Sequence, residues 1–165
     1  MNQSDFESLI ARFAAAATAG DGAALAACFT PDGIYNDYIY GPHTGRAAIA
    51  EMLEHLFHRD ATDYDWQMFD PVCHGTTGYA WSLSSFTSAV PEFAGRRVVI
   101  DGISRFRLTD GLIAEYWESV NGGVAMVQLG VAPTRIERVL QKWARNLGER
   151  AEVKAYLDSR SRQRV

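Results

Sequence analysis

Hydrophobic and polar residues alternate most regularly between residues 98 and 121, where two runs are separated by Asp110 and Gly111. A period of two is typical of β-strands, because successive side chains point to opposite faces of a sheet. An Asp-Gly pair between two such runs favours a tight turn, since Gly adopts positive φ at little cost. The pattern therefore predicts a long antiparallel hairpin over residues 98–121.

The second strand of this hairpin mixes carboxylates with large aromatic rings, because Glu115, Tyr116, Trp117 and Glu118 are consecutive. Burial beside a ring disfavours the charged form of a carboxyl group and raises its pKa. Sites that move protons often use such groups. The strand is therefore either part of a proton-transfer site or a solvent-exposed edge.

Hydrophobic residues spaced three and four positions apart predict helices over residues 4–20, shortly after Asp21, and from Thr44 or Gly45 to about Arg59. Further strands are predicted at 34–40, 65–72 and 77–88. Helices followed by hairpin-connected strands indicate an α+β fold. We expect a cone-shaped, curved, mixed but mostly antiparallel sheet with the N-terminal helices on its concave face. The mouth of such a cone is a natural ligand cavity.

The sequence predicts one domain over residues 1–133, followed by a C-terminal helical extension over residues 134–165 with a frayed basic end. The extension carries nine Lys or Arg against four Asp or Glu, whereas the net charge of the whole chain is −4. Its basic residues are interleaved with Leu, Val and Trp at helical spacing. We therefore expect self-association or packing against the acidic domain, and no nucleic-acid partner.

Several classes of protein and site are not expected from this sequence. Cys28 and Cys73 form no disulfide framework, and neither a signal peptide nor an apolar stretch of membrane-spanning length is visible. We expect a cytoplasmic protein without membrane contact. His55 and His58 have a spacing that zinc sites use, but the helical pattern places both on a solvent-facing surface without a third ligand. We therefore expect no metal, and no nucleotide motif indicates a cofactor.

Several short motifs, taken in order, resemble the nuclear transport factor 2-like superfamily, in particular its SnoaL-like and ketosteroid isomerase-like branch. The resemblance covers roughly residues 5–133. Its motifs are Pro31-Asp32-Gly33-Ile34-Tyr35-Asn36-Asp37, Gly45-Arg46-Ala47-Ala48-Ile49, Tyr116-Trp117-x-x-Val120-Asn121 and Gln128-Leu129-Gly130.

The resemblance implies roles for particular residues. Asp37 falls at the position of the isomerase's carboxylate base. Phe13 and Ser104 replace the Tyr and the protonated Asp that stabilise its enolate, so we expect no efficient steroid isomerisation. Glu118 falls nearest the late acidic residue of SnoaL-like cyclases. The isomerase comparison instead points Trp117 into the cavity, and a bulge near Glu118 would reconcile the two.

The leading hypothesis is a cofactor-free enzyme for proton transfer next to a carbonyl on a hydrophobic small molecule, as a cyclase, isomerase or dehydratase. Asp37 would act as base and Glu118 as partner acid. The predicted substrate-binding residues are Phe13, Tyr35, Trp81, Ser104, Trp117 and Asn121. The alternative is a non-catalytic ligand-binding or dimerisation module, because a fold does not fix a function. We also expect a homodimer formed through the convex sheet face, where Val99 and Ile103 supply apolar surface.

Overall fold

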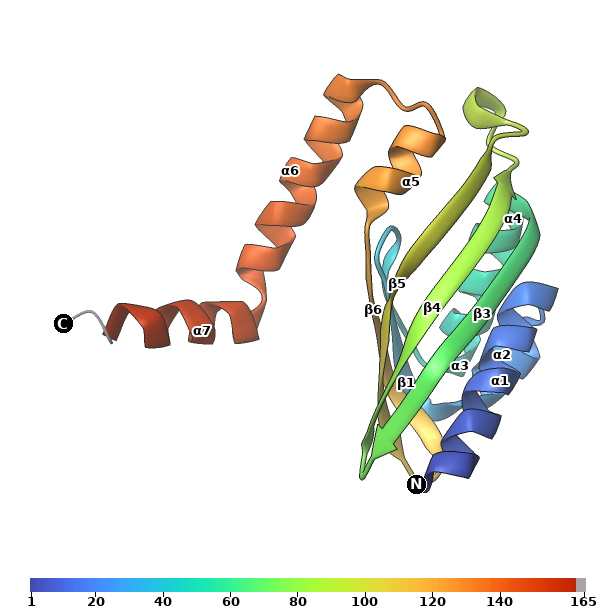
Figure 1. The fold of residues 1–165 in the computed structure, drawn as a ribbon, viewed down its shortest axis with the longest axis vertical. Helices are drawn as coiled ribbons and strands as arrows, with labels where there is room; N and C mark the ends of the chain where they lie inside the picture. The colour runs from blue at the N-terminus through green and yellow to red at the C-terminus, as the bar shows by residue number, and fades with distance from the viewer. Residues whose placement is uncertain (163–165) are drawn as a thin grey trace. The chain divides into compact units, whose positions relative to one another are not determined.

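The computed structural model describes residues 1–162, which form two compact units divided between Leu129 and Gly130. The first unit contains most of the elements (Figure 1). In chain order they are α1 (Gln3–Ala19), α2 (Gly22–Ala27), β1 (Phe29–Asp37), β2 (Gly41–Thr44), α3 (Arg46–Met52), the π-helical turn η1 (Leu53–Phe57), α4 (His58–Asp60), β3 (Ala61–His74), β4 (Thr77–Ser88), the 3₁₀ turn η2 (Pro91–Phe93), β5 (Arg97–Thr109), β6 (Leu112–Val120) and α5 (Gly122–Gln128).

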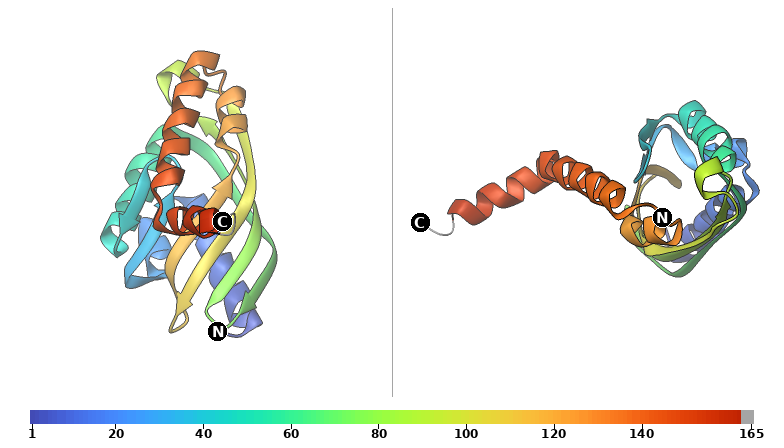
Figure 2. Two further views of the ribbon diagram at one scale, coloured as in Figure 1. Left: turned by 90° about the vertical axis from the view of Figure 1, so that its left-hand side faces the viewer. Right: turned by 90° about the horizontal axis from the view of Figure 1, so that it is seen from above.

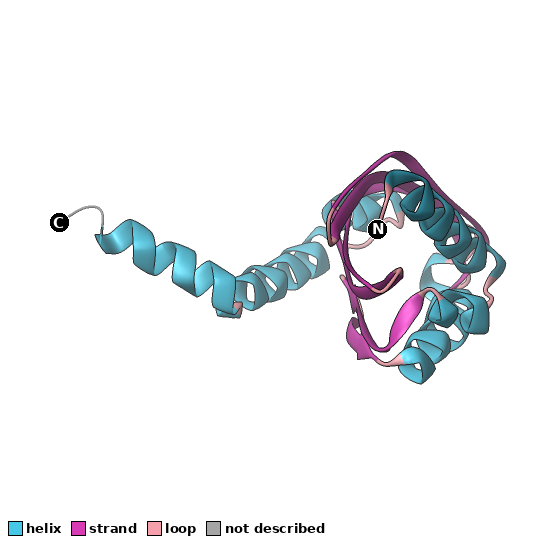
Figure 3. Ribbon diagram, turned by 90° about the horizontal axis from the view of Figure 1, so that it is seen from below, coloured by secondary structure: helices cyan, strands magenta, loops and turns pink. Residues whose placement is uncertain are grey.

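The strands of the described chain form one six-stranded sheet in the order β2-β1-β6-β5-β4-β3. β1 and β6 pair in parallel, and the other neighbours pair antiparallel. The sheet is strongly curved, and α1 to α4 lie along its inner side (Figures 2 and 3). This arrangement confirms the predicted α+β class.

Apolar side chains of α1 pack against the inner face of the sheet. Phe6, Leu9 and Phe13 are completely buried, as their spacing of three and four residues predicts. α1 ends at Gly20, whose φ of 72° is the left-handed conformation that glycine adopts without strain. α1 therefore forms the closed, hydrophobic side of the core.

The predicted hairpin is present as β5 and β6. Asp110 and Gly111 form its turn with φ values of 50° and 80°. Residues 102–107 of β5 pair regularly with residues 115–120 of β6, so that Ser104 lies opposite Glu118 and Arg105 lies opposite Trp117. Paired residues share a face of the sheet, and the pairing therefore separates Glu118 from Trp117 without the bulge that would bring them together.

A π-helical turn interrupts the helix predicted to end near Arg59. The additional residue in such a turn rotates all following side chains around the helix axis. His58 is consequently turned inward, where its Nε2 lies 2.9 Å from the carbonyl oxygen of Ala17 and its ring lies 4.8 Å from that of Tyr64. The solvent-facing position expected for His58 is wrong, because the spacing argument assumed an uninterrupted α-helix.

The second unit contains α6 (Pro133–Glu149) and α7 (Ala151–Arg162). α6 begins at Pro133 and continues through Gly148 to Glu149. None of the helices in the described residues has the length and hydrophobicity of a membrane-spanning segment.

Candidate active site

Two carboxyl groups are brought together by the parallel pairing of β1 and β6. Tyr35 pairs with Tyr116, and Asn36 pairs with Trp117. One step further in the same register, Asp37 lies beside Glu118 on the neighbouring strand. Tyr35 and Tyr116 are both completely buried, and since side chains alternate along a strand, Asp37 and Glu118 share their inner face.

Asp37 is held at the end of β1 by the turn that follows it. Its Oδ1 accepts hydrogen bonds from the backbone N–H of Ile39 at 2.8 Å and of Tyr40 at 2.5 Å. Burial raises the pKa of Asp37 above its usual value, whereas these backbone donors and the nearby His43 act in the opposite direction. Backbone N–H groups favour the ionised form of a carboxyl group, so Asp37 is the better placed of the two to carry the charge.

Glu118 has a different environment from Asp37. Burial and the charge of Asp37 raise the pKa of Glu118 to about 8, against a lowering by its hydrogen bond with Tyr116. Glu118 therefore holds a proton at neutral pH. The two neighbouring carboxyl groups thus differ in protonation: Glu118 can donate a proton, and Asp37 can accept one.

Tyr116 connects Glu118 to the adjacent strand. Its hydroxyl lies 3.0 Å from Oγ of Ser104 and 3.3 Å from Oε2 of Glu118. Ser104 is completely buried. The two hydrogen bonds fix the position of the phenol and orient the carboxyl group of Glu118.

Glu118 lies at the boundary between a closed and an accessible part of the inner face. On β6, Tyr116 is buried, whereas Glu118 and Val120 keep some solvent-accessible surface. The inward positions of β5 show the same gradient, because Ser104 is buried and Ile100 is partly accessible. Of the carboxyl pair, Glu118 is therefore the partly accessible member, whereas Asp37 is 8% exposed.

The SnoaL-like domain profile matches residues 10–116 of this sequence. The chain belongs to the SnoaL-like family. A search of curated protein sequences finds no match.

Several solved structures share the fold of this chain. TsrD from Streptomyces laurentii superposes with a TM-score of 0.69 at 21% identity, over 80% of this chain and 99% of that protein. A protein of ketosteroid isomerase-like fold from Catenulispora acidiphila, solved with trimethylamine, gives a TM-score of 0.68 at 18% identity, over 75% and 93%. A candidate polyketide cyclase from Xanthomonas campestris superposes with a TM-score of 0.64 at 22% identity, over 78% of this chain and 99% of that protein. At these identities the similarity concerns the fold.

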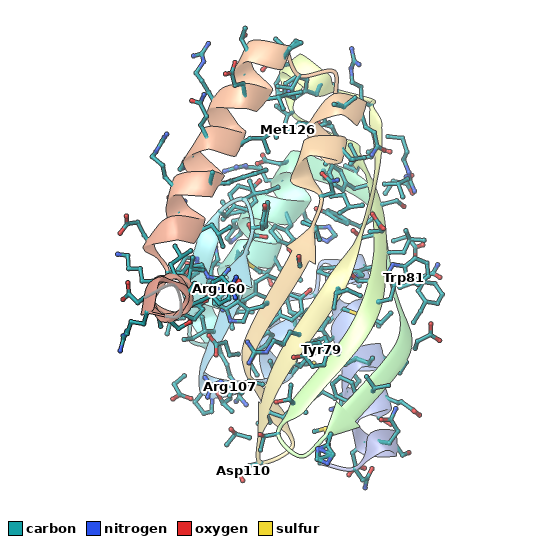
Figure 4. All side chains as sticks on the ribbon, turned by 60° about the vertical axis from the view of Figure 1, so that its left-hand side comes forward. Tyr79, Trp81, Arg107, Asp110, Met126 and Arg160 are labelled. Carbon is teal, nitrogen blue, oxygen red and sulfur yellow. The ribbon has the colours of Figure 1, made fainter. Side chains whose placement is uncertain are left out.

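Three residues that the sequence placed in the SnoaL-like site lie away from the carboxyl pair. Trp117 faces away from Glu118, and its Nε1 donates to Glu115 at 2.9 Å. Trp81 is 40% exposed on the outer face of β4 (Figure 4), where it contacts Phe69. Asn121 is exposed, and its side chain accepts from the backbone N–H of Val124 at the start of α5. Both tryptophans were predicted to bind substrate, but strand alternation turns both outward.

The other predicted residues do lie near the carboxyl pair. The ring of Phe13 is 5.0 Å from that of Tyr116 and 6.2 Å from that of Tyr35, measured between centroids. Ser104 bonds to Tyr116, as described above. Asp37, Glu118, Phe13, Tyr35 and Ser104 thus form one cluster in the structure.

Tyr116 and Tyr64 lie near the carboxyl pair without having been expected there. Tyr116 precedes Glu118 by two residues, and this spacing on a strand was the signal that could have found it. Tyr64 lies just before the strand predicted at 65–72, but β3 begins earlier, at Ala61. Its ring stacks on that of Phe57 with a centroid distance of 6.4 Å and contacts that of Phe86 in a tilted arrangement at 5.4 Å.

No group of three or more His, Cys, Asp or Glu side chains in the described residues is arranged to hold a metal ion. His55 and His58 point in different directions because of the π-helical turn, and His55 is exposed.

Proposed function

We propose that this SnoaL-like protein catalyses proton transfer next to a carbonyl group of a hydrophobic small molecule, as a cyclase, isomerase or dehydratase. The proposal rests on one observation, the neighbouring carboxyl pair with unequal environments. Asp37 acts as the base, and the protonated Glu118 acts as the partner acid. The candidate polyketide cyclase among the structural neighbours is consistent with a substrate that carries several carbonyl groups.

The surroundings of the pair suit a planar, apolar substrate. On the closed side of the inner sheet face, aromatic rings come from Phe13, Tyr35 and Tyr116. Towards the partly accessible side of that face, they come from Tyr64 and Phe86. Aromatic walls bind flat conjugated molecules by stacking and edge contacts. The same low-polarity environment strengthens the interaction between a catalytic carboxylate and the proton that it removes.

Hydrogen exchange tests this proposal directly. The protein is incubated in D₂O with a panel of 1,3-diketones, cyclic enones and aryl ketones, and NMR follows replacement of the hydrogens next to the carbonyl. We expect exchange above the buffer rate for at least one compound, with a rate that falls as pH rises through about 8, where Glu118 loses its proton. Compounds that bind tightly and exchange no faster than in buffer would contradict catalysis.

A non-catalytic binding module is the second candidate, and one observation favours it. The hydrogen bonds from Ile39 and Tyr40 to Asp37 stabilise the turn after β1, and this structural role would by itself explain an aspartate here. The exchange experiment separates the two candidates.

We also propose that the protein forms a homodimer through the outer face of β3, β4 and β5. Exposed apolar side chains lie together on this face, and Tyr79 and Trp81 are visible on it in Figure 4. They are Val72, Tyr79, Trp81, Val99 and Ile103, which we call the outer apolar patch. Apolar patches of this kind often mark interfaces, and a twofold axis would place the same patch on both sides.

Light scattering coupled to size-exclusion chromatography tests the dimer. We expect a dimer for the wild type and a monomer for Ile103→Glu, because Ile103 is 49% exposed within the outer apolar patch and a twofold axis would bring the two new charges together. Ile39→Glu, at an exposed residue in the turn after β1, should remain dimeric. A monomeric wild type would refute the proposed interface.

A further inference from the structure

Tyr35 occupies a central position beside the carboxyl pair. It precedes Asp37 by two residues on β1 and is completely buried. Its ring lies 4.6 Å from that of Tyr116, and it stacks on Phe13 with an angle of 9° between the ring planes. These contacts account for the ring of Tyr35 and leave its hydroxyl group to be explained.

The hydroxyl group of Tyr35 is buried and has no hydrogen-bond partner within the described residues. Tyr116, by contrast, uses its hydroxyl in bonds with Ser104 and Glu118. Buried hydroxyl groups in native proteins nearly always have a partner, because an unpaired one costs stability. Phenylalanine would fill the same space without this cost, so the hydroxyl is better explained by a partner that arrives with a ligand.

The chemistry of Tyr35 defines what that partner is. Burial and the negative charge of Glu118 when ionised raise the pKa of Tyr35 well above its usual value, so the phenol keeps its proton and acts as a donor. Phe13, the ring stacked on it, has no donor. A ligand atom that satisfies Tyr35 is therefore an acceptor, and it gains most from the bond if it becomes negatively charged during the reaction.

We propose that the hydroxyl of Tyr35 donates a hydrogen bond to the carbonyl oxygen of the substrate and stabilises the enolate formed there. This role rests on the proposed proton transfer. Asp37 takes the proton, the electron pair of the broken C–H bond moves into the carbonyl group, and the negative charge collects on the oxygen next to Tyr35. Return of a proton to a carbon atom of the substrate restores the carbonyl group and leaves Asp37 ionised.

The test compares Tyr35→Phe with Tyr116→Phe. 2-Naphthol serves as the probe, because its flat ring carries one oxygen that resembles an enolate oxygen, and its fluorescence reports binding. We expect Tyr35→Phe to weaken naphthol binding about tenfold, the effect of one hydrogen bond, without lowering stability to urea. Tyr116→Phe should lower stability, because it leaves buried Ser104 without the phenol as partner.

A second measurement observes the hydroxyl group in the wild-type protein. With tyrosine labelled at the ζ-carbon, the Tyr35 resonance is assigned by its absence from Tyr35→Phe. We expect this resonance to shift when naphthol binds. An unchanged resonance, unchanged affinity in Tyr35→Phe, a loss of stability in that variant or a failure of the wild type to bind naphthol would each overturn the assignment.

The outcomes for Tyr35 and for the proposed function are distinguishable. If the wild type exchanges ketone hydrogens and Tyr35→Phe does so at the same rate, the role of Tyr35 fails and the proton transfer stands. If naphthol binding depends on Tyr35 but no ketone exchanges, the binding role stands and catalysis fails.

Discussion

Replacing Asp37 by Asn is expected to lower the rate of carbonyl-adjacent hydrogen exchange by ~10²–10⁴-fold, the usual contribution of a positioned general base. The amide oxygen of the substituted side chain would still accept from the backbone N–H groups of Ile39 and Tyr40, so the turn after β1 is preserved. The exchange rate is measured by NMR on the ketone that the wild type processes fastest.

Glu115→Gln is the matched control for this experiment. Glu115 lies on the same strand as Glu118 but on the opposite face, where it is paired with Arg107. We expect this variant to exchange at the wild-type rate. Full activity in Asp37→Asn, with the fold intact by circular dichroism, would remove Asp37 from the mechanism.

Replacing Glu118 by Gln is expected to change how stability depends on pH. The folded protein keeps the proton on Glu118 up to a pKa of about 8, whereas an ordinary glutamate has a pKa of 4.5. Between these pH values the folded state binds more protons than the unfolded state, so this group makes the wild type lose stability as pH rises, by at most ~1.4 kcal/mol per pH unit. Gln cannot ionise, so in the variant this position no longer lowers the stability as pH rises.

Urea unfolding between about pH 5 and pH 9 measures the effect as the difference between variant and wild type. We expect Glu118→Gln to gain stability relative to the wild type as pH rises, and the gain to level off above about pH 8. A difference that is constant with pH would mean that Glu118 ionises normally in the folded protein.

Glu115→Gln should change stability with pH in the opposite direction to Glu118→Gln, and only when the urea measurement is extended below pH 4.5, the ordinary pKa of a glutamate. Although partial burial opposes it, hydrogen bonds from Trp117 and Arg107 hold the pKa of Glu115 below its usual value. At pH values above the pKa of Glu115 in the unfolded chain, the ionised carboxylate therefore stabilises the folded wild type. This stabilisation is lost as pH falls through the lower pKa that Glu115 has in the folded protein. The pair of variants distinguishes a specific effect of Glu118 from a general effect of lost charge.

The hairpin of β5 and β6 could be predicted from sequence because its signals are local. Asp110 and Gly111 fix the turn, and the alternation on either side fixes the strands. Which side of β6 faces the core could not be read in the same way, since both sides carry an aromatic ring and a carboxylate. Packing of Tyr116 against Phe13 of α1, a contact between distant parts of the chain, decides that the face with Tyr116 and Glu118, and not the face with Trp117, points inward.

The π-helical turn shows a second limit of sequence reasoning. Residues 46–60 have a helical spacing of apolar side chains that is compatible with an uninterrupted α-helix. The inserted residue is favoured by tertiary contacts, namely those of His58 with Ala17 and Tyr64. Because these partners come from α1 and β3, periodicity within the segment does not reveal them.

The parallel contact between β1 and β6 has a consequence for how the site is assembled. Asp37 belongs to the first strand of the domain and Glu118 to the last, so most of the chain must be made and folded before the two meet. Contacts between such distant segments form late and slowly, because a large loop has to close first. A nascent or truncated chain that ends before β6 would therefore carry much of the hydrophobic interior but neither the acid nor the phenol that orients it.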